Sequence, residues 1–265
     1  MPTAQINGLD LYYERAGAGP PLLFISGTGG DLRVQPNVFA SPLARTFDLL
    51  AYDQRGLGRT SKPDGPYSMA QYADDAAALM ADQGWDAALV VGVSFGGMVA
   101  QELVLRHPQR VKRLVLACTS PGGAGGASYP FHEIDHLKGE ERARFLMPVS
   151  DTRRDAAWQA ANPEDYERFV QLAAADPYAG EPGQAEGAWN QLEARSHHDT
   201  WDRLGRIACP TMIAAGRYDG IALPATQERM AARIPGAELH WFEGGHLFML
   251  QDRAAYPAII DFLTR

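Results

Sequence analysis

The chain has 265 residues and a formal net charge of −8. Its length suits one α/β domain with an insertion, or at most two small domains. The acidic surface repels nucleic-acid phosphates and no cluster of Lys and Arg stands out against it, so we expect no nucleic-acid partner. No apolar stretch reaches the ~18 residues that a membrane-spanning helix needs, so we expect no membrane partner either.

The N-terminal residues and the two cysteines favour a location in a reducing cellular compartment. Residues 1–5 contain neither a charged start nor an apolar segment, so we expect no signal peptide. The two cysteines, Cys118 and Cys209, form no disulfide framework and no metal-ligand spacing, and each flanks a predicted strand. We interpret them as small core residues, and we expect a cytoplasmic protein that needs no metal and no cofactor.

Strand and helix patterns alternate along the chain. Residues 9–13 predict an early antiparallel strand, and the continuous apolar run 21–25 predicts a central strand. The same strand signal recurs at 47–52, 88–93, 113–118, 211–215 and 237–242. Helical patterns lie between these runs, at 69–83, 95–107, 224–234 and 253–263. This alternation favours an α/β fold with a mostly parallel sheet.

One long interval interrupts the regular spacing of the predicted strands. Residues 121–204 are rich in Ala, Glu, Asp, Arg and Trp with helical periods, and the glycine-rich run 122–126 opens the interval as a predicted flexible loop. A helical insertion at this place lies over the carboxyl ends of the strands, where ligands bind in α/β folds. The sequence therefore predicts a core of residues 1–120 and 205–265, with a helical cap, or lid, of residues 121–204.

Ser94 lies in the most informative motif of the chain. The run Gly92-Val93-Ser94-Phe95-Gly96 fits the G-x-S-x-G pattern, between a predicted strand and a predicted helix. A serine on such a turn presents its hydroxyl to the active site, and the glycines leave room where strand and helix nearly touch. A tight turn that merely contains serine is the alternative, but the flanking strand and helix favour a nucleophile.

A serine nucleophile needs a base within hydrogen-bonding reach and a third group that orients the base. His246 lies in Gly244-Gly245-His246-Leu247, just after the last predicted strand, and is the candidate base; a turn histidine is the alternative. Among the other histidines, we interpret His240, inside a predicted strand, as structural, and the pair His197-His198, in the lid or at its exit, as solvated, with a binding role as the alternative.

Asp219 is the candidate acid. It lies in Gly216-Arg217-Tyr218-Asp219, directly after the predicted strand 211–215, where a carboxylate can accept the ring hydrogen of His246 and hold its tautomer. The corresponding position one strand earlier, residues 118–121, offers no carboxylate. A cap for an Asx turn is the alternative role for Asp219.

Two backbone N–H groups are predicted to hold an oxyanion. One belongs to Phe95, at the start of the helix after the nucleophile. The other belongs to Thr28, in the glycine-rich loop Ser26-Gly27-Thr28-Gly29-Gly30, although such a loop often serves only to reverse the chain direction.

Aromatic residues of the predicted lid offer candidate pocket surface. We single out Trp158 and Trp189, since tryptophan offers the largest area, and we expect most lid aromatics to pack the lid itself.

Together these residues resemble the α/β-hydrolase family, over nearly the whole chain. Ser94, Asp219 and His246 match the family's triad in order and placement, and residues 53–58 resemble its D-x-R-G-x-G turn, which is usually structural. The resemblance implies a mostly parallel sheet of eight strands, helices on both faces and a helical lid after the sixth strand.

Within the family, the chain is most similar to small bacterial esterases, enol-lactonases and cofactor-free haloperoxidase-like members. Residues 29–32 and 116–123 are similar to segments of 3-oxoadipate enol-lactonase-like sequences. Ser26 is a departure, because many members carry histidine at the start of the oxyanion loop. The backbone donors can survive that change.

The resemblance implies hydrolysis of a small-molecule carboxylic ester or lactone through an acyl-enzyme. Dehalogenase and epoxide hydrolase members are excluded, since they use aspartate where this chain has serine. Cofactor-free perhydrolysis and carbon–carbon bond hydrolysis use the same triad and stay open as alternatives. A non-catalytic ligand-binding protein of this fold is the alternative from another class. The sequence does not identify the substrate or the oligomeric state.

Overall fold

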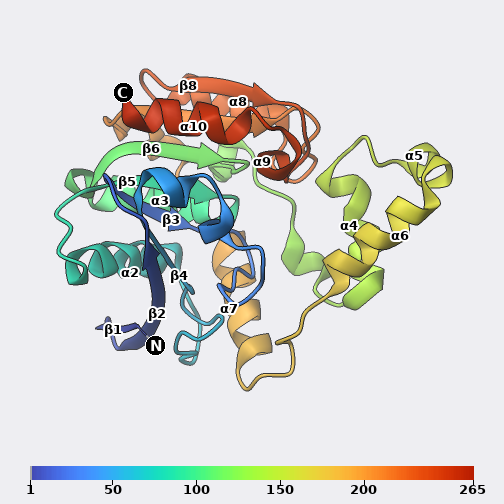
Figure 1. Ribbon diagram of the computed structural model, residues 1–265, viewed down its shortest axis with the longest axis horizontal. Coiled ribbons are helices and arrows are strands. Elements are labelled where there is room, and N and C mark those ends of the chain that lie inside the picture. The colour runs from blue at the N-terminus through green and yellow to red at the C-terminus, as the bar shows by residue number, and fades with distance from the viewer. Residues whose placement is uncertain (1) are drawn as a thin grey trace.

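Eight strands form one sheet within residues 2–265, the part of the chain that this computed structural model describes (Figure 1). In their order across the sheet, the strands are β1 (Thr3–Ile6), β2 (Leu9–Ala16), β4 (Asp48–Tyr52), β3 (Pro21–Ile25), β5 (Ala88–Val93), β6 (Val111–Ala117), β7 (Thr211–Gly216) and β8 (Glu238–Phe242). β2 is antiparallel to both of its neighbours, and all other neighbouring pairs are parallel. The predicted mostly parallel sheet of eight strands is confirmed.

Helices cover both faces of the sheet, as predicted. The core on one face takes most of its buried helical residues from α2 (Met69–Asp82), α3 (Phe95–Arg106) and α8 (Pro224–Arg233). Those that supply the core on the other face are α1 (Leu43–Thr46), α9 (Phe248–Gln251) and α10 (Ala255–Thr264).

The central strands are apolar at nearly every position because both of their sides are buried. In β3, Leu22 belongs to the core shared with α1 and α10, whereas Leu23 and Ile25 belong to the core shared with α2 and α3. Successive side chains of a strand point to opposite faces. A strand with a core on each face therefore reads as a continuous apolar run.

Three short elements are not indicated by the sequence patterns. β1 has four residues, of which only Ala4 and Ile6 are buried, and it pairs with β2 across a turn at residues 7–8. β2 in turn extends to Ala16, beyond the predicted residues 9–13. The helices α1 and α9 have four residues each, about one turn, which is too short to show a helical period.

Between β6 and β7 the chain leaves the sheet and forms four α-helices: α4 (Gly139–Ser150), α5 (Ala156–Ala161), α6 (Pro163–Ala174) and α7 (Gln184–Ser196). Figure 1 shows α4, α5 and α6 gathered in a lobe beside the sheet. α7 lies nearer the core, where Gly187 packs directly on Gly56. Helices thus occupy the predicted interval, and their action as a lid stays a prediction.

The glycine-rich run at the start of this interval differs from the expected flexible loop. Residues Gly123–Gly125 form a short 3₁₀ helix, and Gly122 makes a β-bridge with Asp199, near the end of the inserted segment. The glycines are needed for close approach, because a Cβ on Gly122 would collide with the carbonyl oxygen of His198.

Among residues 2–265 we find no helix with the length and apolar composition of a membrane span. Both cysteines are free. Cys118 is buried at the end of β6 and Cys209 is half-buried before β7.

Candidate active site

Ser94 lies at a sharp turn between β5 and α3. Its φ of 54° and ψ of −115° lie outside the regions that residues with side chains ordinarily adopt. A Cβ on Gly96 would collide with the carbonyl oxygen of Ile25, and a Cβ on Gly92 with that of Gly96. Strand and helix can approach this closely only because both positions are glycine.

His246 lies between Ser94 and Asp219. Its Nδ1 donates to Asp219 Oδ2 at 2.8 Å, because a carboxylate oxygen can only accept. Nε2 is then the accepting nitrogen, and it lies 2.9 Å from the Ser94 hydroxyl oxygen, which donates. This arrangement allows the hydroxyl proton to pass to the imidazole. The structure thus brings the three predicted residues together, and their catalytic role stays a prediction.

The backbone of its own loop holds Asp219. Oδ1 accepts from the N–H groups of Ile221 and Ala222 at 2.8 and 2.9 Å, and the side chain is fully buried. Oδ2 thereby faces His246. The sequence offers capping of an Asx turn and contact with His246 as alternative roles for Asp219. In the structure, Oδ1 accepts from the turn and Oδ2 accepts from His246, so one carboxylate makes both sets of contacts.

The inserted segment between β6 and β7 supports the His246 loop. The His246 N–H donates to the Ser150 carbonyl at 2.6 Å. The side chain of Gln251 accepts from the Gly245 N–H at 2.7 Å and donates to Asp151 at 3.0 Å. Sequence reasoning missed these supports, because Gln251 and Asp151 are 100 positions apart and no local pattern marks them.

The N–H groups of Thr28 and Phe95 are available to an oxyanion. Neither donates a hydrogen bond to another atom of residues 2–265. The Thr28 loop also lies against the nucleophile, since a Cβ on Gly27 would be 3.4 Å from the Cβ of Ser94. Two aimed backbone donors beside a serine can stabilise the negative charge of a tetrahedral intermediate.

The loop that contains Thr28 is held from two sides. Gln191, on α7, accepts from the Gly29 N–H at 2.8 Å. Gln54 donates to the Ser26 carbonyl at 2.9 Å. Gln54 belongs to the turn of residues 53–58, to which the sequence assigns no chemistry, and its observed role is to support this loop.

The two tryptophans proposed for the pocket lie on different helices. Trp158, on α5, stacks on Phe169 of α6 with 6.3 Å between ring centroids. Trp189, on α7, is 43% exposed. Neither lines the cavity described below. Contact of either residue with a substrate stays a prediction.

The remaining histidines of interest differ in burial. His240 is half-buried in β8, with its Nε2 3.1 Å from Glu238 Oε2. His197 is exposed, but His198 is 6% exposed, so the interpretation of His198 as solvated is wrong. Burial, with a further contribution from the charge of Arg203, lowers the pKa of His198 to about 3. His198 is therefore a neutral, buried imidazole.

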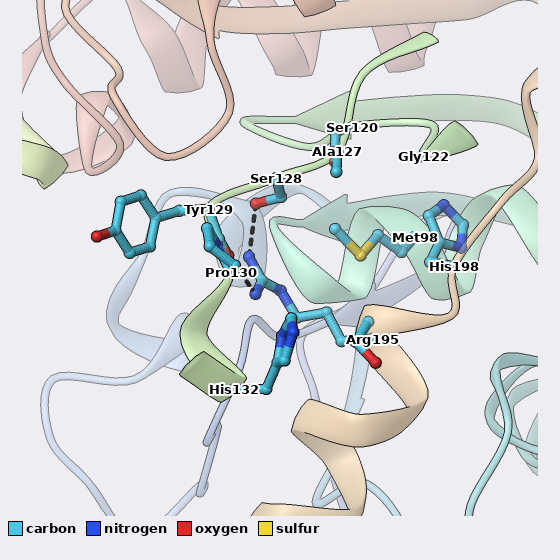
Figure 2. A pocket seen from close by; sticks show the side chains of 11 residues that line it. Met98, Ser120, Gly122, Ala127, Ser128, Tyr129, Pro130, His132, Arg195 and His198 are labelled. Carbon is cyan, nitrogen blue, oxygen red and sulfur yellow. Dashed lines mark hydrogen bonds between the residues drawn. The ribbon is translucent and has the colours of Figure 1, made fainter. Parts of the chain in front are cut away.

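A small cavity lies beside His198 (Figure 2). Its volume is about 70 Å³, and Met98, Ser120 and Arg195 help to line it. None of the three triad residues lines the cavity. It adjoins their site nonetheless, because Met98 is one helical turn beyond Ser94 and donates its N–H to the Ser94 carbonyl. Of the residues that line this cavity, sequence reasoning considered a binding role only for His198, as the alternative to a solvated side chain.

Comparisons with known proteins cover most or all of the chain. A family model described as the alpha/beta hydrolase fold matches residues 20–252. A poly(3-hydroxyalkanoate) depolymerase of Ectopseudomonas oleovorans is 30% identical over 247 residues, which are 92% of this chain and 84% of that protein. The 3-oxoadipate enol-lactonase 2 of Acinetobacter baylyi is 26% identical over 246 residues, 93% of this chain and 89% of that protein. The crystal structure of the enol-lactonase from Burkholderia xenovorans LB400 matches with a TM-score of 0.80 and 26% identity, over 100% of both chains.

Proposed function

Because the chain belongs to the α/β-hydrolase family, we propose that it hydrolyses a carboxylic ester or lactone of a small molecule through an acyl-enzyme. The hydrogen bonds from Ser94 through His246 to Asp219, at 2.9 and 2.8 Å, are the observation that carries this proposal. The similarity to an enol-lactonase supports the choice of ester or lactone.

In the first half of the reaction, Ser94 Oγ forms a bond to the substrate carbonyl carbon while its proton passes to His246 Nε2. The N–H groups of Thr28 and Phe95 donate to the oxyanion. His246 then gives the proton to the leaving alkoxide as the carbon–oxygen bond breaks, and the acyl group remains on Ser94. Asp219 stabilises the imidazolium that forms between these two transfers.

In the second half, water replaces the alcohol. His246 takes a proton from the water, the hydroxyl oxygen attacks the acyl carbon, and the proton returns to Ser94 as the acid leaves. Residues 121–204 would cap this site. In support of a cap, Ser150 and Gln191 of that interval contact the His246 loop and the Thr28 loop, respectively.

A panel of short nitrophenyl esters and unsubstituted lactones tests the proposal, together with an alkyl fluorophosphonate that labels activated serines. We expect hydrolysis by the wild type and one adduct, located on Ser94 by mass spectrometry of peptides. Absence of both turnover and labelling would overturn the proposal. Turnover only of ring-fission diketones, or only in the presence of peroxide, would instead support carbon–carbon bond hydrolysis or perhydrolysis.

A further inference from the structure

The buried side of α7 is polar. Gln184, Gln191 and Arg195, with His198 just beyond the helix, follow one another at spacings of seven, four and three residues, which places them on one face. Each is at most 9% exposed. A helix that only packed against a core would bury apolar side chains at these positions. We call these four residues the α7 polar face.

Every member of the α7 polar face carries a buried polar atom that has no hydrogen-bond partner within residues 2–265. These atoms are Gln184 Oε1, Gln191 Nε2, Arg195 Nε and both ring nitrogens of His198. The backbone of Ser120 nevertheless lies close enough to the His198 ring to oppose the lowering of its pKa, although no hydrogen bond of good geometry joins them. Buried polar groups in folded proteins are nearly always satisfied, and each exception calls for an explanation such as an ordered water, an ion or a ligand. Two of the four residues, Arg195 and His198, line one cavity, and there the unpartnered atoms point to a ligand rather than to packing.

Arg195 is the charged member of this face. Its Nη1 donates to the Tyr129 carbonyl at 2.7 Å and its Nη2 to Ser128 Oγ at 2.5 Å, so these bonds use two of the five N–H donors of a guanidinium. Both acceptors are neutral. Burial, and next the like charge of Arg142, lower the pKa of Arg195 to about 10. Arg195 is therefore a buried cation at neutral pH, and no carboxylate of residues 2–265 forms an ion pair with it.

Arg195 and His198 line the same cavity of about 70 Å³ (Figure 2). Ser120 also lines it, and its hydroxyl oxygen has no partner either. Met98 and Ala127 supply apolar surface. The guanidinium of Arg195 lies over the Phe131 ring, 4.4 Å from its centroid, but no carboxylate of residues 2–265 pairs with it. The cavity thus combines one positive charge without an anionic partner, neutral donors and room for a group of a few atoms.

We propose that this cavity is a subsite for a carboxylate group. The carboxylate accepts from the unused N–H groups of Arg195, from the N–H of the neutral His198 ring and from the Ser120 hydroxyl. A planar guanidinium matches the two oxygens of a carboxylate, and the bond is charge-assisted. A neutral polar ligand would leave the buried charge of Arg195 unpaired, which is unfavourable.

Two sources can supply this carboxylate. The carboxylate can belong to the ester or lactone itself, in which case the inference rests on the proposed function. The substrate is then a half-ester or a lactone that carries an acid group. The position of Met98, one turn from Ser94, fits one molecule that reaches both sites. If the carboxylate is a separate small acid, it fills the cavity independently of turnover.

Matched esters test the first source. The monomethyl esters of succinate, glutarate and adipate are compared with methyl butanoate, pentanoate and hexanoate, in which a methyl group replaces the carboxylate. We expect wild-type kcat/KM to favour at least one acid-bearing ester over its neutral partner by about 10- to 100-fold. Arg195→Gln should abolish this preference, and Arg195→Lys should restore part of it. The matched control is Arg168→Gln, which removes an exposed arginine of α6 and should keep the preference.

Calorimetric titration of Ser94→Ala protein, at constant ionic strength, tests binding without turnover. Acetate and monomethyl adipate are the probes. Tighter binding of the half-ester, lost in Ser94→Ala/Arg195→Gln, supports a substrate carboxylate, and equal binding of acetate supports a separate acid. Carboxylate binding without turnover of any ester would refute the proposed function and leave the subsite standing. If proteins that retain Arg195 show no preference for acid-bearing esters and bind no carboxylate, the subsite proposal is overturned. This outcome does not depend on whether the Arg195 variants fold.

Discussion

The triad and the α7 polar face differ in how far their hydrogen bonds are completed. Asp219 accepts three hydrogen bonds, and both ring nitrogens of His246 are engaged. On the α7 polar face, Gln191, Arg195 and His198 each retain a buried atom without a partner. The triad is complete without a ligand, whereas the α7 polar face is not. We interpret the first as a preorganised reaction centre and the second as a recognition surface.

This difference follows from how each region is anchored. The triad residues follow β5, β7 and β8, and the carboxyl ends of parallel strands meet at one edge of the sheet. Loops that leave a rigid sheet can hold side chains within hydrogen-bonding distance of one another. α7 lies outside the sheet, and Ala194 alone of its residues belongs to one of the two cores that stabilise the sheet. Its buried face is therefore available for polar residues.

Loss of the nucleophile is expected to have the largest effect. Ser94→Ala should lower kcat by about 10⁴-fold or more. The melting temperature should change little, because within residues 2–265 the hydroxyl bonds only to His246. Initial rates on a nitrophenyl ester and a thermal melt measure both quantities. Wild-type-like rates in a clean Ser94→Ala preparation would end the serine-hydrolase proposal.

Asp219→Asn should come next, with a rate loss of about 10⁴-fold. The asparagine oxygen can keep the two backbone bonds of Oδ1, but its amide then donates to His246 Nδ1. Nδ1 must accept, so Nε2 carries the hydrogen and cannot take the Ser94 proton.

The matched control for this variant is Asp252→Asn. Asp252 also accepts two backbone N–H groups, at 2.9 and 2.7 Å, but lies outside the triad. We expect its rate to stay within about twofold of wild type, by the rule that surface changes away from special features have small effects. If Asp219→Asn instead retains more than about a tenth of the activity, the acid of the triad lies elsewhere.

Much of the fold could be predicted from local sequence patterns. A strand that is buried on both sides must be apolar at nearly every position, and this leaves a clear signal in the sequence. β3 and β5 are apolar almost throughout since each borders two cores. β1 could not be found in this way, because only Ala4 and Ile6 are buried in a strand of four residues. Its partner β2 supplies the hydrogen bonds, and pairing is not a local property of either sequence.

The site divides in the same way. Ser94, Asp219 and His246 each follow a strand signal, so their placement could be predicted. The solvated reading of His198 failed because its neighbours are polar and His197 is indeed exposed; one step along the chain turns the side chain inward. A usable signal was present in the spacing of Gln184, Gln191 and Arg195, polar residues on one side of a helix.

A third prediction tests the unsatisfied state of His198. Its pKa is about 3 in the folded protein, against ~6.5 in the unfolded chain. Between these values the unfolded state binds more protons, so stability falls as the pH is lowered from 6.5 toward 3, by at most ~1.4 kcal/mol per pH unit. His198→Gln lacks this contribution. Its free energy of unfolding, relative to wild type, should therefore rise by about 2 to 3 kcal/mol between pH 7 and pH 4.5.

Urea unfolding at several pH values measures this difference. His197→Gln is the control, because the neighbouring histidine is exposed and should show no such trend. A flat difference for His198→Gln would mean that the folded protein stabilises the charged ring. In that case the α7 polar face would be better satisfied than its hydrogen bonds indicate, and the contrast with the triad would weaken.

The smallest effects are expected from Trp158→Ala and Trp189→Ala, which test whether recognition depends on lid aromatics instead of the α7 polar face. Trp158 stacks on Phe169, so its loss should cost about 1 to 2 kcal/mol and lower the melting temperature by a few degrees. Trp189 lies two positions from Gln191, about 200° around α7 and thus on the opposite side, and it is 43% exposed. A side chain that only packs the lid should leave the ratio of kcat/KM between small and bulky esters within about twofold of wild type, whereas loss of a pocket-lining side chain typically changes such a ratio by tenfold or more. A tenfold change in either variant would show that this tryptophan lines the pocket. Specificity would then depend on the lobe of α4–α6, for Trp158, or on the exposed side of α7, for Trp189, and not on the α7 polar face.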